Sequence, residues 1–146
     1  MFTSAYLKLR KRVPEEWVQK LQRNGFLLSI ARWFQPKELG LYRMGGALSD
    51  HRMWVPGQWA ASWISGCFET HICEMIERHV QFGWTVLDIG AHVGYHTLLL
   101  AKHVGDQGKV IAFEPLPENL HVLRKNITLN HYEKRVRAVS YTHLRA

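Results

Sequence analysis

The chain has 146 residues, of which 47% are hydrophobic and 21% are charged. This composition is typical of a globular chain with one modest core, and it argues against global disorder. The longest apolar runs are far shorter than the roughly 20 residues of a membrane-spanning helix, and no apolar signal-peptide core follows the start. We therefore expect a cytoplasmic protein without a transmembrane segment.

The formal net charge of +7 is concentrated near the N-terminus. Residues 1–37 hold eight Lys/Arg and two Glu, a charge of +6, whereas the remainder of the chain carries only +1. Because this remainder is nearly neutral, the charge pattern predicts no nucleic-acid partner. A weak contact of the basic segment with a membrane surface stays open, although packing of its helices on the core is the simpler interpretation.

Residues 1–60 are expected to form an N-terminal extension of helices and a hairpin. Pro14 followed by two glutamates is typical of a helix start, and Asn24-Gly25 is a plausible end. A second short helix is expected over residues 26–34. Two short strands are expected over residues 41–44 and 52–55, on either side of Gly45-Gly46.

Strands and helices alternate in the second half of the chain. Apolar residues at helical spacing predict a helix over residues 69–80. The segments that follow are a strand at 85–89, a helix at 95–104, a strand at 109–113, a helix at 117–130 and the start of a strand at 135–139. Buried strands alternating with amphipathic helices predict an α/β fold, with a parallel sheet that helices cover on both faces. Residues 61–138 would then form part of a Rossmann-like domain.

A glycine-bearing turn joins the first of these strands to its helix. Gly90 permits a tight turn and removes a side chain that would collide with a ligand, while Gly94 lets the helix pack closely on the strand. A dinucleotide site would carry G-x-G-x-x-G, but His92 stands where the middle glycine belongs. Asp88, just before the turn, would repel a pyrophosphate and attract the cationic amino-acid end of S-adenosylmethionine. The turn therefore favours S-adenosylmethionine over NAD.

A second carboxylate follows the next strand. Glu114 comes directly after Phe113, so it is expected on the same rim of the sheet as Asp88. A carboxylate in this position can accept hydrogen bonds from ribose hydroxyls. The glycine turn and Glu114 together predict a nucleoside-binding site.

These motifs resemble the class I S-adenosylmethionine-dependent methyltransferases of the FkbM type. The resemblance rests on VLDIGAHVGY at residues 86–95, GKVIAFEP at 108–115, NITLN at 126–130 and GCFETH at 66–71. It implies that the methionine part of the cofactor is held by Asp88, Gly90 and Gly94, and that the ribose is held by Glu114. Ala91 is also expected among the cofactor-binding residues. Glu69 is a weaker candidate near the amino-acid end of the cofactor; the alternative is an N-cap or first-turn acid of the next helix. His92 departs from the family, in which asparagine is usual.

The resemblance implies in-line methyl transfer to an oxygen of a small-molecule or glycan acceptor, such as a sugar or a secondary metabolite. The catalytic base and the oligomeric state are unknown from these residues. We expect no metal, because His92 and His96 lack a third ligand. An RNA methyltransferase, a NAD-dependent oxidoreductase disfavoured by the glycine spacing, and a non-catalytic interaction module built on the basic N-terminal region are the alternatives.

The end of the chain has an unusual sequence. Residues 139–146 (VSYTHLRA) resemble the translation of a transposon-based sequencing adapter, so we expect them to be a non-native tail. The alternative is an ordinary third strand with a polar tail. On the first interpretation the chain is a fragment of a longer methyltransferase, and it is expected to be inactive by itself.

Overall fold

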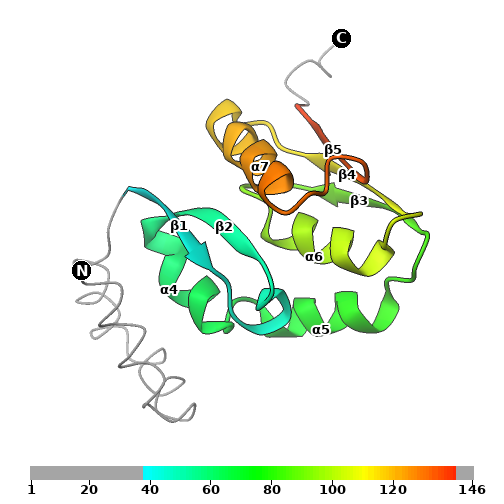
Figure 1. The fold of residues 1–146 in the computed structure, drawn as a ribbon, viewed down its shortest axis with the longest axis horizontal. Helices are drawn as coiled ribbons and strands as arrows, with labels where there is room; N and C mark the ends of the chain where they lie inside the picture. Colours follow the sequence, from blue (N-terminus) through cyan, green and yellow to red (C-terminus); the bar gives the residue numbers. More distant parts are fainter. Residues whose placement is uncertain (1–37, 141–146) are drawn as a thin grey trace. The chain divides into compact units, whose positions relative to one another are not determined.

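The computed structural model describes residues 38–140. Its elements are β1 (Leu39–Arg43), the 3-10 helix η1 (Gly46–Leu48), β2 (Arg52–Pro56), α4 (Gly57–Ser65), α5 (Thr70–His79), β3 (Thr85–Ile89), α6 (Tyr95–Val104), β4 (Lys109–Phe113), α7 (Pro117–Leu129) and β5 (Val136–Val139) (Figure 1). The helices expected between residues 14 and 34, and residues 141–146 of the expected tail, lie outside the described residues. Residues 39–140 belong to one compact unit of the chain.

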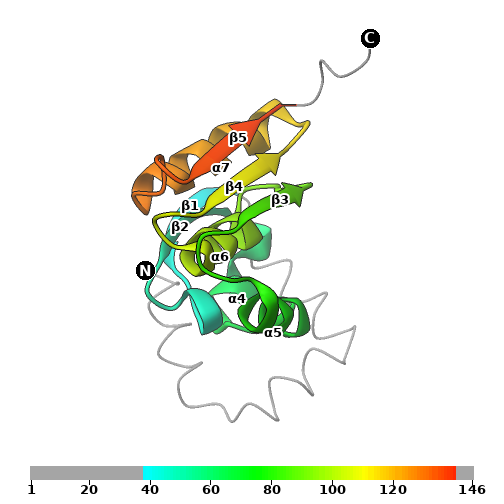
Figure 2. The same cartoon turned by 90° about the vertical axis from the view of Figure 1, so that its right-hand side faces the viewer.

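The central element is a parallel sheet of three strands in the order β3-β4-β5 (Figure 2). Ile89 of β3 is opposite Phe113 of β4, and Phe113 is opposite Val139 of β5. The register therefore brings the carboxyl ends of all three strands to one edge. The predicted α/β fold with a parallel sheet is confirmed.

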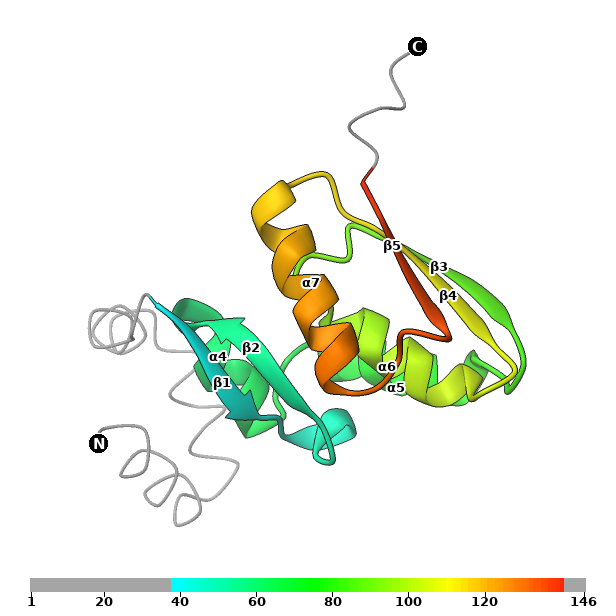
Figure 3. The same ribbon diagram turned by 45° about the horizontal axis from the view of Figure 1, so that its top comes forward.

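Helices α6 and α7 cover the same face of this sheet (Figure 3). Right-handed crossovers from β3 to β4 and from β4 to β5 step in one direction, so both helices fall on one side. On the other face of the strand, Leu87 is 57% exposed and Ile89 is 74% exposed. Within residues 38–140, the predictions of a sheet covered on both faces and of a fully buried strand at 85–89 are therefore wrong.

Strands β1 and β2 form the predicted antiparallel hairpin, and β2 packs against α7 on the side away from the sheet (Figure 3). Met53 and Val55 of β2 are fully buried, in one cluster with Leu98 and Leu99 of α6. The hairpin is thus tied to the helices that carry the glycine loop. The domain boundaries expected at residues 60 and 138 stay a prediction.

Helix α4 is not predicted by the sequence pattern, because it begins at a glycine and is rich in serine and tryptophan, which are mediocre helix formers. Its stability comes from burial instead. Trp63 is 3% exposed, and its ring centroid lies 5.1 Å from those of both Phe68 and Tyr95. None of the helices within residues 38–140 has the length and apolar character needed to cross a bilayer.

Candidate functional site

The candidate site lies at the carboxyl ends of β3 and β4. Asp88 is the fourth residue of β3, the glycine loop of residues 90–94 follows that strand, and Glu114 follows β4 directly. A hydrogen bond of 2.8 Å from the His92 amide to Glu114 Oε2 joins the loop to the second strand. The structure therefore brings Asp88, the glycine loop and Glu114 together at one edge of the sheet.

The first half of the glycine loop is an open turn. Gly90 has a φ of +87°, which favours glycine, and the amides of Gly90 and Ala91 both donate to the Phe113 carbonyl at 2.9 and 3.0 Å. A Cβ on Gly90 would meet nothing within 4 Å. The space beside the Gly90 Cα is therefore open, so a ligand can approach the backbone there.

Gly94, at the end of the loop, is needed for close packing. Its φ is +101°, and a Cβ there would lie 2.5 Å from Leu123 Cδ1 of α7. The prediction that Gly94 lets the helix pack closely on the strand is wrong about the neighbour, which is α7. Gly94 therefore permits α6 and α7 to approach each other at the loop.

Glu114 is held firmly in one orientation. The residue is 4% exposed, and Oε1 accepts hydrogen bonds from the Leu116 amide at 3.0 Å and from Asn119 Nδ2 at 3.2 Å. Together with the bond from His92, three of the roughly four acceptor positions of an ionised carboxylate are used. The remaining position belongs to Oε2, on the oxygen that faces the loop.

The Asp88 carboxylate receives fewer hydrogen bonds from the protein than Glu114 does. Thr97 Oγ1 of α6 donates a hydrogen bond to Asp88 Oδ2. Burial raises the pKa of Asp88, and so does the nearby Glu114, while Thr97 and His96 act in the opposite direction. The ionised carboxylate is therefore poorly solvated, and a cationic ligand group beside it would stabilise it.

Glu69 occupies the N-cap position of α5 with a φ of +41°, yet its side chain makes no capping hydrogen bond. Instead its Oε2 lies 3.3 Å from His96 Nε2 on the first turn of α6, an ion-pair distance without hydrogen-bond geometry. The Glu69 side chain is 42% exposed. Its position next to the first turn of α6 is compatible with the weaker ligand role predicted for it.

His92, the departure from the FkbM pattern, adopts a φ of +51°. Asparagine and histidine are both enriched in this left-handed region, so the exchange preserves the loop conformation. The ring centroid of His92 lies 6.0 Å from that of Trp59 on α4. Burial lowers the pKa of His92, although the nearby Glu114 acts in the opposite direction. The lowered pKa favours a neutral imidazole at pH 7.

Two asparagines bind the outer edge of the hairpin: Asn126 of α7 and Asn130, the C-cap of that helix. Asn126 Oδ1 accepts from the Trp54 amide at 2.7 Å, and its Nδ2 donates to the Trp54 carbonyl at 3.0 Å. Asn130 makes the same pair of bonds with the backbone of Arg52, at 3.3 and 2.9 Å. Four helical residues rise about 6 Å and two strand residues span about 6.8 Å, so the two side chains match alternate residues of β2.

Asn126 also reaches the glycine loop. It is fully buried, and its Nδ2 donates a third bond, of 2.8 Å, to the Val93 carbonyl. One amide thus connects the hairpin, α7 and the loop. Asn119, Thr97 and Asn126 are the residues near the site that the sequence motifs do not assign to it.

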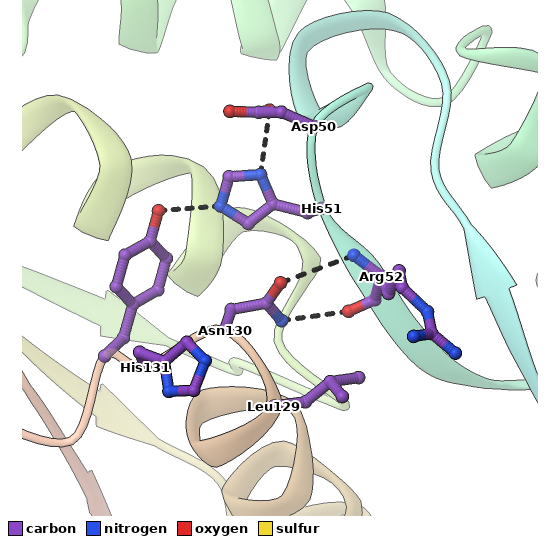
Figure 4. A pocket seen from close by; sticks show the side chains of 7 residues that line it. Asp50, His51, Arg52, Leu129, Asn130 and His131 are labelled. Carbon is purple, nitrogen blue, oxygen red and sulfur yellow. Dashed lines mark hydrogen bonds and ion pairs between the residues drawn. The ribbon is translucent and has the colours of Figure 1, made fainter.

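A separate cavity of about 350 Å³ lies where the hairpin turn meets the end of α7 (Figure 4). His51 bridges Asp50 at 2.9 Å and the Tyr132 hydroxyl at 2.7 Å across it. Burial alone would raise the pKa of Asp50, but hydrogen bonds from Lys102 and His51 lower it to about 2. None of the residues that line this cavity belongs to the glycine loop, so we assign it a structural role at the hairpin.

The TRM5/TYW2 methyltransferase domain matches residues 69–143, half of the chain. The chain belongs to this family. The match spans Asp88, the glycine loop and Glu114, and it confirms the prediction of a class I methyltransferase domain with S-adenosylmethionine as cofactor. The more specific FkbM type and the cytoplasmic location stay predictions.

The chain is similar to several known proteins over part of their length. Protein-L-isoaspartate O-methyltransferase 1 of Archaeoglobus fulgidus is 34% identical over 62 residues, which are 42% of this chain and 28% of that protein. The tRNA m1G37 methyltransferase of M. jannaschii has a TM-score of 0.52 at 21% identity, over 70% of this chain and 29% of that one, and it shares the fold. A putative rRNA-methylase from Clostridium thermocellum has a TM-score of 0.49 at 26% identity, over 52% and 41% of the two chains. The chain thus spans about a quarter of the curated relative.

These matches correct one expectation. The prediction that nucleic acid is not a partner is contradicted by the TRM5/TYW2 match. The physical reason is that a net charge summed over a whole domain does not report how its charges are distributed.

Proposed function

We propose that this protein transfers a methyl group from S-adenosylmethionine to RNA. The proposal is carried by the family match over the segment in which Asp88 and Glu114 meet at one rim of the sheet. The RNA substrate is supported by the family and by the tRNA methyltransferase that shares the fold. It replaces O-methylation of a sugar, glycan or secondary metabolite as the main hypothesis; no comparison supports those acceptors.

Three predicted residues fit the cofactor. Asp88 presents a poorly solvated carboxylate that suits the cationic amino group, and the open backbone at Gly90 admits the chain of the amino acid. Glu114 offers its remaining acceptor position on Oε2 to a ribose hydroxyl. The cofactor supplies an electrophilic methyl group on a sulfonium, and the protein contributes binding, orientation and exclusion of water.

Ala91, Gly94 and Glu69 complete the proposed site in supporting roles. Ala91 is 6% exposed and anchors the loop through its bond to the Phe113 carbonyl. Gly94 sets the approach of α7, and Glu69 approaches α6 through His96. We assign no general base to the described residues.

The direct test is transfer of a labelled methyl group from S-adenosylmethionine to bulk tRNA and to bulk rRNA, with nuclease digestion to prove that the label is in RNA. Whereas the sequence alone predicts an inactive fragment, the proposal requires labelled RNA with the wild-type chain. It also requires at least a tenfold lower rate with Asp88→Asn, which is nearly isosteric. Label that resists nuclease, or an equal rate in the variant, would contradict the proposal.

Protein carboxyl methylation is the second candidate, because the curated relatives that match are protein-L-isoaspartate O-methyltransferases. An isoaspartyl peptide and a mixed glycan acceptor belong in the same assay. Transfer to the peptide alone would favour this candidate, and transfer to the glycan alone would restore the FkbM-type hypothesis.

A further inference from the structure

We propose that the outer face of the β1–β2 hairpin, with Lys125 of α7, binds the phosphate backbone of the RNA substrate through Arg43, Arg52 and Lys125. The inference rests on the proposed function for the identity of the partner. None of these three residues belongs to the proposed cofactor site.

The first observation is a pair of like charges. Arg43 and Arg52 are directly opposite each other in the hairpin, and both are exposed. The backbone groups of Arg52 face Asn130, so this is a non-hydrogen-bonded pair, in which the Cα atoms are typically about 4.5 Å apart. Like charges placed this way destabilise a hairpin. An anion bound between the two guanidinium groups would remove the repulsion.

The second observation is a third cation on the same side. Leu41 of β1 is opposite Trp54 of β2, and the Lys125 ammonium lies 4.2 Å from the centroid of the Trp54 ring. Because side chains alternate along a strand, Trp54 shares the face of Arg52. Three cations and a half-buried indole therefore meet on one surface, and an indole can also stack on an unpaired base.

Within the part of the chain that the structure describes, these cations lack acidic partners. No ion pair formed by residues 38–140 includes Arg43, Arg52 or Lys125. Arg43 donates through Nε to the Ser49 carbonyl at 3.0 Å, which orients its guanidinium and leaves its charge uncompensated. The acids nearest in sequence to the two arginines are Glu38, before β1, and Asp50, which Lys102 and His51 already bind. The acid nearest in sequence to Lys125 is Glu118, in the first turn of α7. The Arg52 side chain extends away from the amide of Asn130 (Figure 4).

The surface is also connected to the candidate site. Asn126 binds the backbone of Trp54 and the carbonyl of Val93 in the glycine loop. RNA held on the hairpin would therefore contact an element that Asn126 links directly to the glycine loop. This connection favours a substrate-binding surface over an unrelated basic patch.

The test measures binding of a fluorescent single-stranded RNA by the full chain over a range of salt concentrations. Each phosphate contact contributes about 0.7 to the slope of log K against log salt for a single strand. We expect Arg43→Ala, Arg52→Ala and Lys125→Ala each to reduce the slope by about 0.7. The basic N-terminal segment is present in every variant, so its contribution cancels. Arg78→Ala is the matched control, because Arg78 pairs with Glu74 on the exposed surface of α5.

The thermal midpoint shows whether a variant is folded. Removal of either arginine of the opposed pair is expected to leave the midpoint unchanged or to raise it. If the chain binds RNA and all three variants behave like Arg78→Ala, the hairpin surface is refuted and the proposed function stands. If the wild-type chain binds no RNA, both the surface and the RNA substrate are refuted. Loss of binding to phosphatidylserine vesicles with unchanged RNA binding would instead assign the surface to membranes.

Discussion

Replacement of Asn126 by alanine tests the link between the hairpin and the glycine loop. The change removes three hydrogen bonds, two with the backbone of Trp54 and one with the Val93 carbonyl, all from a fully buried side chain. At about 1 kcal/mol net for each bond, the loss is about 3 kcal/mol. Alanine is a better helix former than asparagine by up to about 0.7 kcal/mol, so we expect the free energy of unfolding to fall by about 2–3 kcal/mol.

Asn130→Ala is the matched control. Asn130 also makes three bonds, to the Arg52 amide, the Arg52 carbonyl and the Asn126 carbonyl, but it is only half-buried and does not touch the loop. Water can replace its bonds, so we expect a loss of about 1 kcal/mol or less. Urea denaturation of both variants measures the difference.

Native-state hydrogen exchange then separates a local effect from a global one. In Asn126→Ala, we expect the amides of Trp54 and Gly94 to exchange faster than the global loss of stability requires. In Asn130→Ala, exchange of the Gly94 amide should accelerate only as much as the global loss of stability requires. Equal losses of stability in the two variants, with equal protection of Gly94, would refute the idea that Asn126 positions the loop.

Four further substitutions probe the candidate site. Asp88→Asn should raise stability and weaken S-adenosylhomocysteine binding, measured by calorimetry. The folded-state pKa of Asp88 lies above its usual 3.8, so its ionisation destabilises the wild type as pH rises through that range, and the effect disappears in the variant. Cofactor affinity should rise over the same pH range in the wild type only. Gly90→Ala should cost about 1–2 kcal/mol of stability for its backbone and also weaken binding, whereas Gly94→Ala should cost about 1–3 kcal/mol more than Gly90→Ala in thermal unfolding. Glu114→Gln should weaken binding by about 1–3 kcal/mol, because its amide must face an N–H donor; unchanged affinity would exclude Glu114 from the site.

Local patterns predict most of the α/β core. The bounds of β3, α6 and β4 are those expected from the sequence, and α7 ends one residue earlier than expected. These elements have clear apolar periodicity and are bordered by glycine or proline, so neighbouring residues are sufficient to define them. The position of Asp88 and Glu114 on one rim follows from the same reasoning, because it depends only on strand order and direction.

Long-range contacts account for what the sequence could not predict. Trp54 is 72 residues from Asn126 along the chain, and no local pattern indicates that a helical amide binds its backbone. The exposed face of β3 depends on which helices lie over the sheet, and helix α4 depends on the aromatic cluster around Trp63. Each of these features is decided by tertiary packing and not by propensity.

The two carboxylates of the rim have opposite environments, and this difference indicates what each one binds. Glu114 receives three N–H donors from the protein, so its charge is already compensated and it can accept one more bond from a neutral hydroxyl. Asp88 receives a single hydroxyl donor and is disfavoured in its charged form by burial, so it gains most from a cation. A ligand with a cationic group at one end and a ribose at the other satisfies both residues, whereas a pyrophosphate would place negative charge beside Asp88. On the proposed assignment, this arrangement would favour S-adenosylmethionine over a dinucleotide by electrostatics as well as by glycine spacing.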